Sequence, residues 1–218
     1  MGRIVDLSHA IEHGMTTYPG LPAPEITDHL TREASRSHYA LGTEFHIGRI
    51  NMVANTGTYL DTPFHRYPDG SDLATTPLDR MAQLDAVVVD AVGEPTVDVE
   101  LLQGNRVSGR AVLLHTGWSR HWGTEAYFTG HSYLTATGSA WLVEHGAVLV
   151  GIDSLNIDGT ATGERPAHSS LLAAGIPIVE HLCRLDQLPR EGFQFSSAPV
   201  GVVGLGTFPV RAYAVLDQ

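Results

Sequence analysis

The sequence contains no lysine and only one cysteine, and both shortages narrow its possible chemistry. All 13 basic residues are arginine, which excludes a Schiff-base lysine and a lysine general base. The lone Cys183 excludes an intrachain disulfide and a zinc site built from several cysteines. Basic residues are also few, and the formal net charge is −11. Because nucleic acids require basic surfaces, we expect no nucleic-acid partner.

Long apolar runs are also missing. No run approaches the roughly 18 residues that are needed to cross a bilayer, so we expect no membrane partner. The first seven residues lack the apolar stretch of a signal peptide, and we expect a cytoplasmic protein. A hydrophobic share of 43% with 17% charged residues is typical of a globular protein. We found no repeat or linker, and therefore predict a single domain over residues 1–218.

Short apolar runs alternate irregularly with helical segments. Strands are predicted at residues 4–8, within 26–54, and at 84–90, 111–115, 147–153, 176–180, 193–196 and 211–216. Helices are predicted at residues 98–103, 140–145 and 168–174. Strands outnumber helices, which favours a single α/β domain with a mixed sheet or small barrel flanked by helices.

The densest polar chemistry lies in residues 55–65, Asn-Thr-Gly-Thr-Tyr-Leu-Asp-Thr-Pro-Phe-His. Gly57 and Pro63 predict a bent backbone rather than a plain strand. Pro63 separates Asp61 from His65 and fixes φ, which helps to hold the two side chains in a set relation. An aspartate beside a histidine can orient the imidazole or share a metal with it, although both residue types are also common in turns.

A second candidate pair is His168 and Glu180, which flank an apolar segment with the turn Gly-Ile-Pro-Ile. Taken alone, the histidine at a helix start and the glutamate at a strand end could both be solvated. Together with residues 55–65, however, this segment resembles the bacterial kynurenine formamidase and cyclase family. The signature of that family has the form His-x-Gly-Thr-His-x-Asp-x-Pro-x-His. Further resembling segments appear in the family's order and cover nearly the whole chain, at residues 6–9, 18–20, 114–118, 151–153 and 209–214.

The resemblance implies a swivelling β/β/α domain of the cyclase type, usually assembled as a homodimer or homotetramer. The family's metal-binding aspartate falls on Asp61 and its catalytic histidine on His65. The histidine and glutamate that support a second metal fall on His168 and Glu180.

The resemblance fails at two positions that hold metal ligands in the family. The first two histidines of the signature are replaced here by Asn55 and Tyr59, so the chain resembles a divergent member. An amide and a neutral phenol are poor ligands for zinc or manganese. Both losses fall on the same metal, which suggests that this metal is gone. A phenol can donate a proton to a substrate oxygen, and an amide can stabilise an oxyanion.

We therefore predict a catalytic set without metal or cofactor, consisting of Asn55, Tyr59, Asp61, His65, His168 and Glu180. The predicted enzyme forms or opens a C–O or C–N ring in a small-molecule substrate, by cyclisation, dehydration or hydrolysis, using side-chain acids and bases. A first alternative is an amidohydrolase resembling arylformamidase, with a single zinc or manganese on Asp61, His168 and Glu180. A second alternative is a non-catalytic binding protein.

Overall fold

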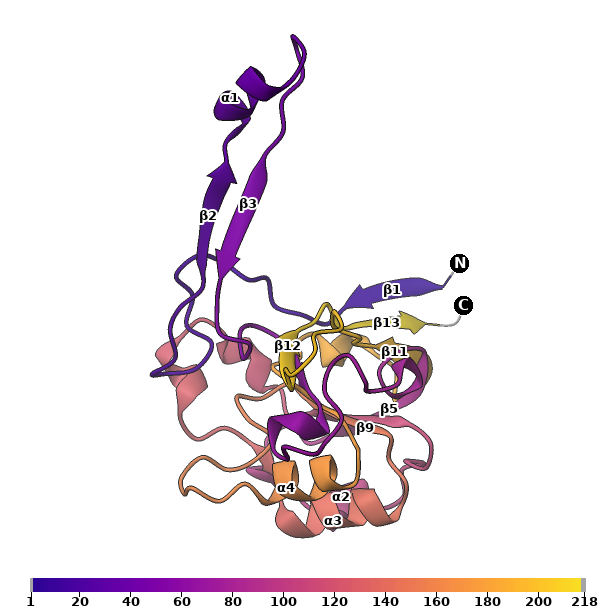
Figure 1. Cartoon of the computed structure of the whole chain (residues 1–218). Helices are drawn as coiled ribbons and strands as arrows, with labels where there is room; N and C mark the ends of the chain where they lie inside the picture. Colours follow the sequence, from indigo (N-terminus) through magenta and orange to yellow (C-terminus); the bar gives the residue numbers. More distant parts are fainter. Residues whose placement is uncertain (1, 217–218) are drawn as a thin grey trace.

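A nine-stranded mixed sheet forms the centre of the computed structural model, which describes residues 2–216 (Figure 1). The four strands β5, β7, β9 and β10 run parallel, and the remaining pairs are antiparallel. In spatial order the strands are β1 (Arg3–Asp6), β13 (Tyr213–Leu216), β11 (Glu191–Ser196), β5 (Leu84–Asp90), β7 (Ala111–His115), β9 (Leu149–Ile152), β10 (Ile178–Glu180), β4 (Tyr59–Asp61) and β12 (Thr207–Pro209).

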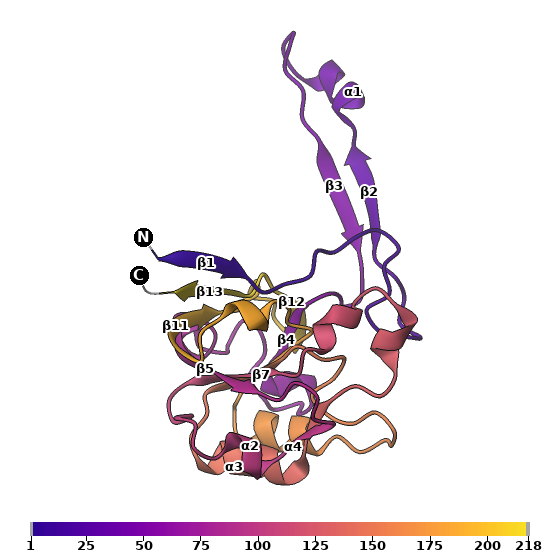
Figure 2. The same cartoon turned by 180° about the vertical axis from the view of Figure 1, so that it is seen from behind.

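Three short helices cover one face of this sheet: α2 (Val99–Leu102), α3 (Ala136–Glu144) and α4 (Pro166–Ala173) (Figures 1 and 2). Successive strand residues point to opposite faces, so Val112 packs toward the helices while Leu113 joins a second core on the other face. Burial on both faces explains why the central strands are continuous apolar runs. The predicted single α/β domain with a mixed sheet is confirmed.

A long hairpin projects from the body of the molecule (Figures 1 and 2). It consists of β2 (Glu25–Leu30), α1 (Arg32–Ser35) and β3 (Ile47–Asn51), and we call residues 25–51 the arm. The strands predicted within 26–54 are thus present, but a helix and a turn separate them. Several apolar side chains of the arm are exposed, namely Ile26, Tyr39, Leu41, Phe45, Ile47 and Ile50.

One backbone prediction was wrong in part. Residues 59–61 form a plain strand, β4, which pairs with β10 on one side and β12 on the other. The bends lie at its two ends, where Gly57 has a φ of +66° and a 3-10 turn spans Pro63–His65. Gly57 and Pro63 thus bend the backbone on either side of the strand, and pairing with two neighbours keeps residues 59–61 extended between them. A small separate sheet joins β6 (Thr96–Val97) to β8 (Tyr133–Leu134). Within residues 2–216, no helix has the length and apolar character to cross a membrane.

Candidate active site

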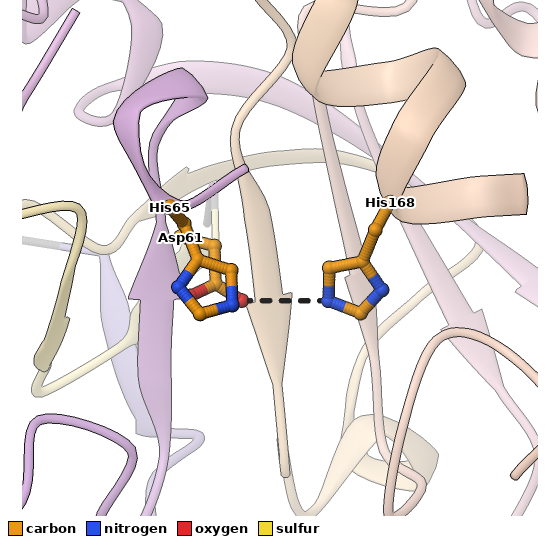
Figure 3. Close-up of side chains that lie close together, drawn as sticks. All are labelled: Asp61, His65 and His168. Carbon is orange, nitrogen blue, oxygen red and sulfur yellow. Dashed lines mark ion pairs between the residues drawn. The ribbon is translucent and has the colours of Figure 1, made fainter. Parts of the chain in front are cut away.

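Two neighbouring strands and one helix bring the predicted site residues together. Tyr59 and Asp61 lie two residues apart on β4 and therefore face the same side. The antiparallel register with β10 places Glu180 opposite Tyr59. The 3-10 turn after β4 returns His65 toward Asp61, and α4 carries His168 to the same point. Figure 3 shows the Asp61 carboxylate partly behind the His65 ring, with a dashed line for its ion pair with His168.

A cavity of about 420 Å³ opens over this cluster. Asp61 is fully buried behind it, whereas the His65 side chain is 35% exposed. The sequence-predicted residues thus share one location, and five of the six line the cavity, namely Asn55, Tyr59, His65, His168 and Glu180.

The Thr207 hydroxyl on β12 joins His65 to Asp61. It donates a hydrogen bond to Asp61 Oδ1, and His65 Nδ1 lies 2.7 Å from the same hydroxyl oxygen. Because the hydroxyl proton points to the carboxylate, His65 must donate its Nδ1 proton to Thr207. A neutral His65 then carries its lone pair on Nε2. This arrangement fixes the tautomer that a general base requires.

Asp158 orients the second histidine. Its Oδ2 lies 2.7 Å from His168 Nδ1 and also accepts the backbone N–H of His168 at 3.0 Å. Its Oδ1 accepts the N–H of Ala167 at 2.7 Å. These N–H groups belong to the first turn of α4, where Arg165 provides no side-chain cap. The buried Asp158 carboxylate therefore caps the helix and turns His168 Nε2 toward Asp61 and Glu180.

Carboxylates set the charge of His168. Burial alone would lower the pKa of His168, but Glu180, Asp158 and Asp61 together raise that pKa to about 10. An imidazolium at this position has Nδ1–H bonded to Asp158 and Nε2–H free to donate. His168 can therefore stabilise negative charge on a substrate oxygen.

The Tyr59 phenol donates a hydrogen bond to Glu180 Oε2 at 2.6 Å, and the other Glu180 oxygen accepts Ile157 N–H at 2.6 Å. Burial, Glu180 and Asp61 raise the pKa of Tyr59 well above its ordinary value, and Asn55 opposes that shift. Burial and Asp61 also raise the pKa of Glu180, to about 7, against the opposing effect of His168. The phenol thus keeps its proton at neutral pH, beside a carboxyl group that can exchange one.

The same cluster offers a donor set for a divalent ion. His168 Nε2 lies 3.7 Å from Asp61 Oδ2 and 3.7 Å from Glu180 Oε1. Asp61 Oδ2 is buried and has no hydrogen-bond partner among the described residues. Ligand atoms of Asp61, His65 and His168 also lie within 4.8 Å of one another. Imidazole and carboxylate donors suit zinc or manganese, so these residues fit one ion. The metal-free site predicted from the sequence stays a prediction.

Sequence reasoning missed Thr207 and Asp158. Thr207 gives no local signal, because its partner His65 is 142 residues away. Asp158 gives a weak one: α4 begins with Pro166, yet the preceding residue, Arg165, is not a capping type. A search for a distant residue that could cap α4 would have considered the aspartates that follow the buried strand at 149–152, and Asp158 is one of them.

Comparison with known proteins identifies the family. The Cyclase family model matches residues 5–159, which is more than half of the chain. This chain belongs to the Cyclase family. Kynurenine formamidase from Bacillus cytotoxicus is 26% identical over 209 residues, and that from Bacillus cereus is 27% identical over 212 residues. Each alignment covers 95% of this chain and 95% of the relative.

Solved structures of the family share the whole fold. Isatin hydrolase A from Labrenzia aggregata superposes with a TM-score of 0.83 at 21% identity, covering 99% of this chain and 94% of that one. A structure described as a potential metal-dependent hydrolase with cyclase activity superposes with a TM-score of 0.82 at 24% identity, covering 100% of both chains. This Cyclase family member is accordingly a cyclase-family hydrolase.

Proposed function

We propose that this enzyme hydrolyses a C–N or C–O bond at the carbonyl of a small molecule, opening a ring or an amide, by acid–base catalysis without a metal. Relatives named kynurenine formamidase and isatin hydrolase support hydrolysis as the reaction class. The observation that carries the metal-free mechanism is the 2.6 Å hydrogen bond from Tyr59 to Glu180. It places a proton donor where the family signature has a metal-ligating histidine.

In this mechanism His65, Tyr59 and Glu180 transfer protons, and His168 stabilises charge. His65 Nε2 removes a proton from water, which attacks the carbonyl carbon. His168 Nε2–H stabilises the negative charge that develops on the carbonyl oxygen, with the Asn55 amide at the cavity wall. Tyr59 then protonates the leaving nitrogen or oxygen as the C–N or C–O bond breaks, and the protonated form of Glu180 returns a proton to the phenol. The proton that His65 took from water passes to Glu180 as the products leave, which restores both groups. Each positioned acid or base is typically worth ~10²–10⁴ in rate.

Tyr59→Phe tests the mechanism, and Tyr127→Phe is its matched control. Each change removes one buried phenol, which is hydrogen-bonded to Glu180 in the case of Tyr59 and to His181 in the case of Tyr127. With an aryl formamide such as formanilide as substrate, Tyr59→Phe should lower kcat by about tenfold or more, and Tyr127→Phe should not. Equal kcat values for wild type and Tyr59→Phe would remove the phenol from the mechanism.

A single-metal hydrolase is the second candidate, and the unpartnered buried Oδ2 of Asp61 favours it. Asp61, His168 and Glu180 would hold the ion, which would lower the pKa of a bound water. Metal analysis of protein purified without added metal separates the candidates. Stoichiometric zinc or manganese, with turnover abolished by a chelator and restored by that metal, would establish this candidate and overturn the metal-free proposal.

Assembly and location complete the proposal. We propose a homodimer or homotetramer, which the family resemblance implies and the exposed apolar residues of the arm support. We also propose the cytoplasmic location that the sequence led us to expect. Both proposals are independent of the chemistry above.

A further inference from the structure

One arginine contributes to the lining of the catalytic cavity. Arg165 directly precedes α4 and is half buried, whereas Asp61 and Glu180 are buried at the inner end. Arg165 also lines a neighbouring cavity that shares His65 and His168 with this one. It therefore forms part of the outer wall, between solvent and the reacting groups.

The guanidinium of Arg165 is fixed on one side and open on the other. Its Nη1 donates to the carbonyl oxygens of Glu164 at 2.7 Å, Thr162 at 2.8 Å and Gly159 at 3.3 Å. A guanidinium has five N–H donors, and the donors on Nε and Nη2 bond to no backbone carbonyl or carboxylate in the described part of the chain. The Tyr18 phenol lies within hydrogen-bonding reach of the guanidinium, so the two groups stand side by side. No carboxylate within residues 2–216 forms an ion pair with Arg165. The turn thus holds a positioned cation that lacks a counter-ion.

The charged side chains of the cavity would orient a bound anionic ligand. Even with a charged His168 and a protonated Glu180, the carboxylates of Asp61 and Asp158 leave the inner end with a net negative charge, which repels a substrate carboxylate. Arg165 attracts an anion to the outer wall, where the Tyr18 phenol offers a further hydrogen bond. A ligand with an anionic group at Arg165 therefore turns its opposite end toward Tyr59 and His65.

We propose that Arg165, with Tyr18, binds a carboxylate of the substrate, and that the substrates are small amides, lactams or esters carrying a free carboxylate. This inference rests on the proposed function for the reaction at the inner end. An exposed face of two N–H donors matches the two oxygens of a carboxylate, which favours a planar anion over a neutral group. The net charge of −11 makes such a local cation more important for capturing an anionic substrate.

Binding of benzoate and benzamide tests the anion site without requiring turnover. Benzoate should bind the wild-type protein, and Arg165→Gln should weaken its binding by about tenfold or more while leaving benzamide binding unchanged. Arg66→Gln is the matched control, since Arg66 lies beside His65 but does not line this cavity. Calorimetric titration gives the dissociation constants. Failure of benzoate to bind the wild type, an equal loss of both ligands in Arg165→Gln, or a comparable loss in Arg66→Gln would overturn the proposal.

Hydrolysis of 2-formamidobenzoate and formanilide separates this inference from the proposed function. Arg165→Gln should raise KM for 2-formamidobenzoate by about tenfold or more, with KM for formanilide and both kcat values near those of wild type. If wild type hydrolyses neither compound, the proposed hydrolysis of aryl formamides fails and the benzoate titration still decides the role of Arg165. If both KM values rise together, Arg165 only holds its turn and the carboxylate site is refuted.

Discussion

Replacing Thr207 with valine should disable the connection between His65 and Asp61. Within residues 2–216, the Thr207 hydroxyl supplies the side-chain hydrogen bond to Asp61, whose other oxygen is buried without a partner. Valine has a similar shape but no hydroxyl, so it leaves a fully buried carboxylate without that bond. A hydrogen bond to a charged group contributes about 1.5–3 kcal/mol, and an unsatisfied buried charge costs more. We therefore expect the free energy of unfolding to fall by about 3 kcal/mol.

The same change should slow catalysis, because His65 loses the acceptor that keeps its proton on Nδ1. We expect kcat with formanilide to fall by about tenfold to hundredfold, part of the usual contribution of a general base. Urea unfolding measures the stability, and initial rates measure kcat. Thr207→Ser is the control, since it keeps the hydroxyl and removes one methyl, at a cost of about 1 kcal/mol. If valine behaves like wild type, or serine is as damaging as valine, the hydroxyl does not act in this way.

Three further changes test other parts of the molecule. Asp158→Asn should lower kcat by about tenfold or more, because an amide cannot accept all the N–H groups that now face the carboxylate, including His168 Nδ1. A normal kcat in this variant would contradict the positioning role of Asp158. Burial raises the pKa of Glu180 to about 7, and the proposed mechanism needs the protonated form of Glu180 to return a proton to Tyr59, so kcat should fall as pH rises through that value. If Glu180 instead binds a metal, it must be ionised, and kcat would rise over the same pH range. The double change Phe45→Ser and Ile50→Ser in the arm should reduce the mass measured by light scattering toward 23.4 kDa, the mass of one chain. A wild-type mass already at that value would argue against the oligomer.

The central sheet was predictable because its strands carry their own signal. β5, β7 and β9 are buried on both faces, so each is a continuous apolar run. β4 and β12 have three residues each, too few to show a period, and they exist because neighbouring strands pair with them. The sequence therefore indicates the middle of the sheet better than the edge that carries the site.

The candidate site, like the sheet, could be predicted only in part from the sequence. The two motif segments identified five of the residues that line the cavity, because their types and order match a known pattern. They did not show which groups bond to which: Thr207 reaches His65 across 142 residues, and Asp158 reaches His168 from a loop outside both segments. Such partners are set by the tertiary fold, and no local pattern specifies them.

The two lost histidines illustrate why the partners matter. From the sequence, Asn55 and Tyr59 are only poor metal ligands. In the structure, the Tyr59 phenol engages one oxygen of Glu180, while Asp61 Oδ2 and His168 Nε2 still face each other across 3.7 Å. Asn55 and Tyr59 therefore alter one side of the site where the family pattern has metal ligands, and the other side is still able to accept a cation. Tyr59→Phe acts on the first side and metal depletion on the second, so the two experiments report on separate parts of one site.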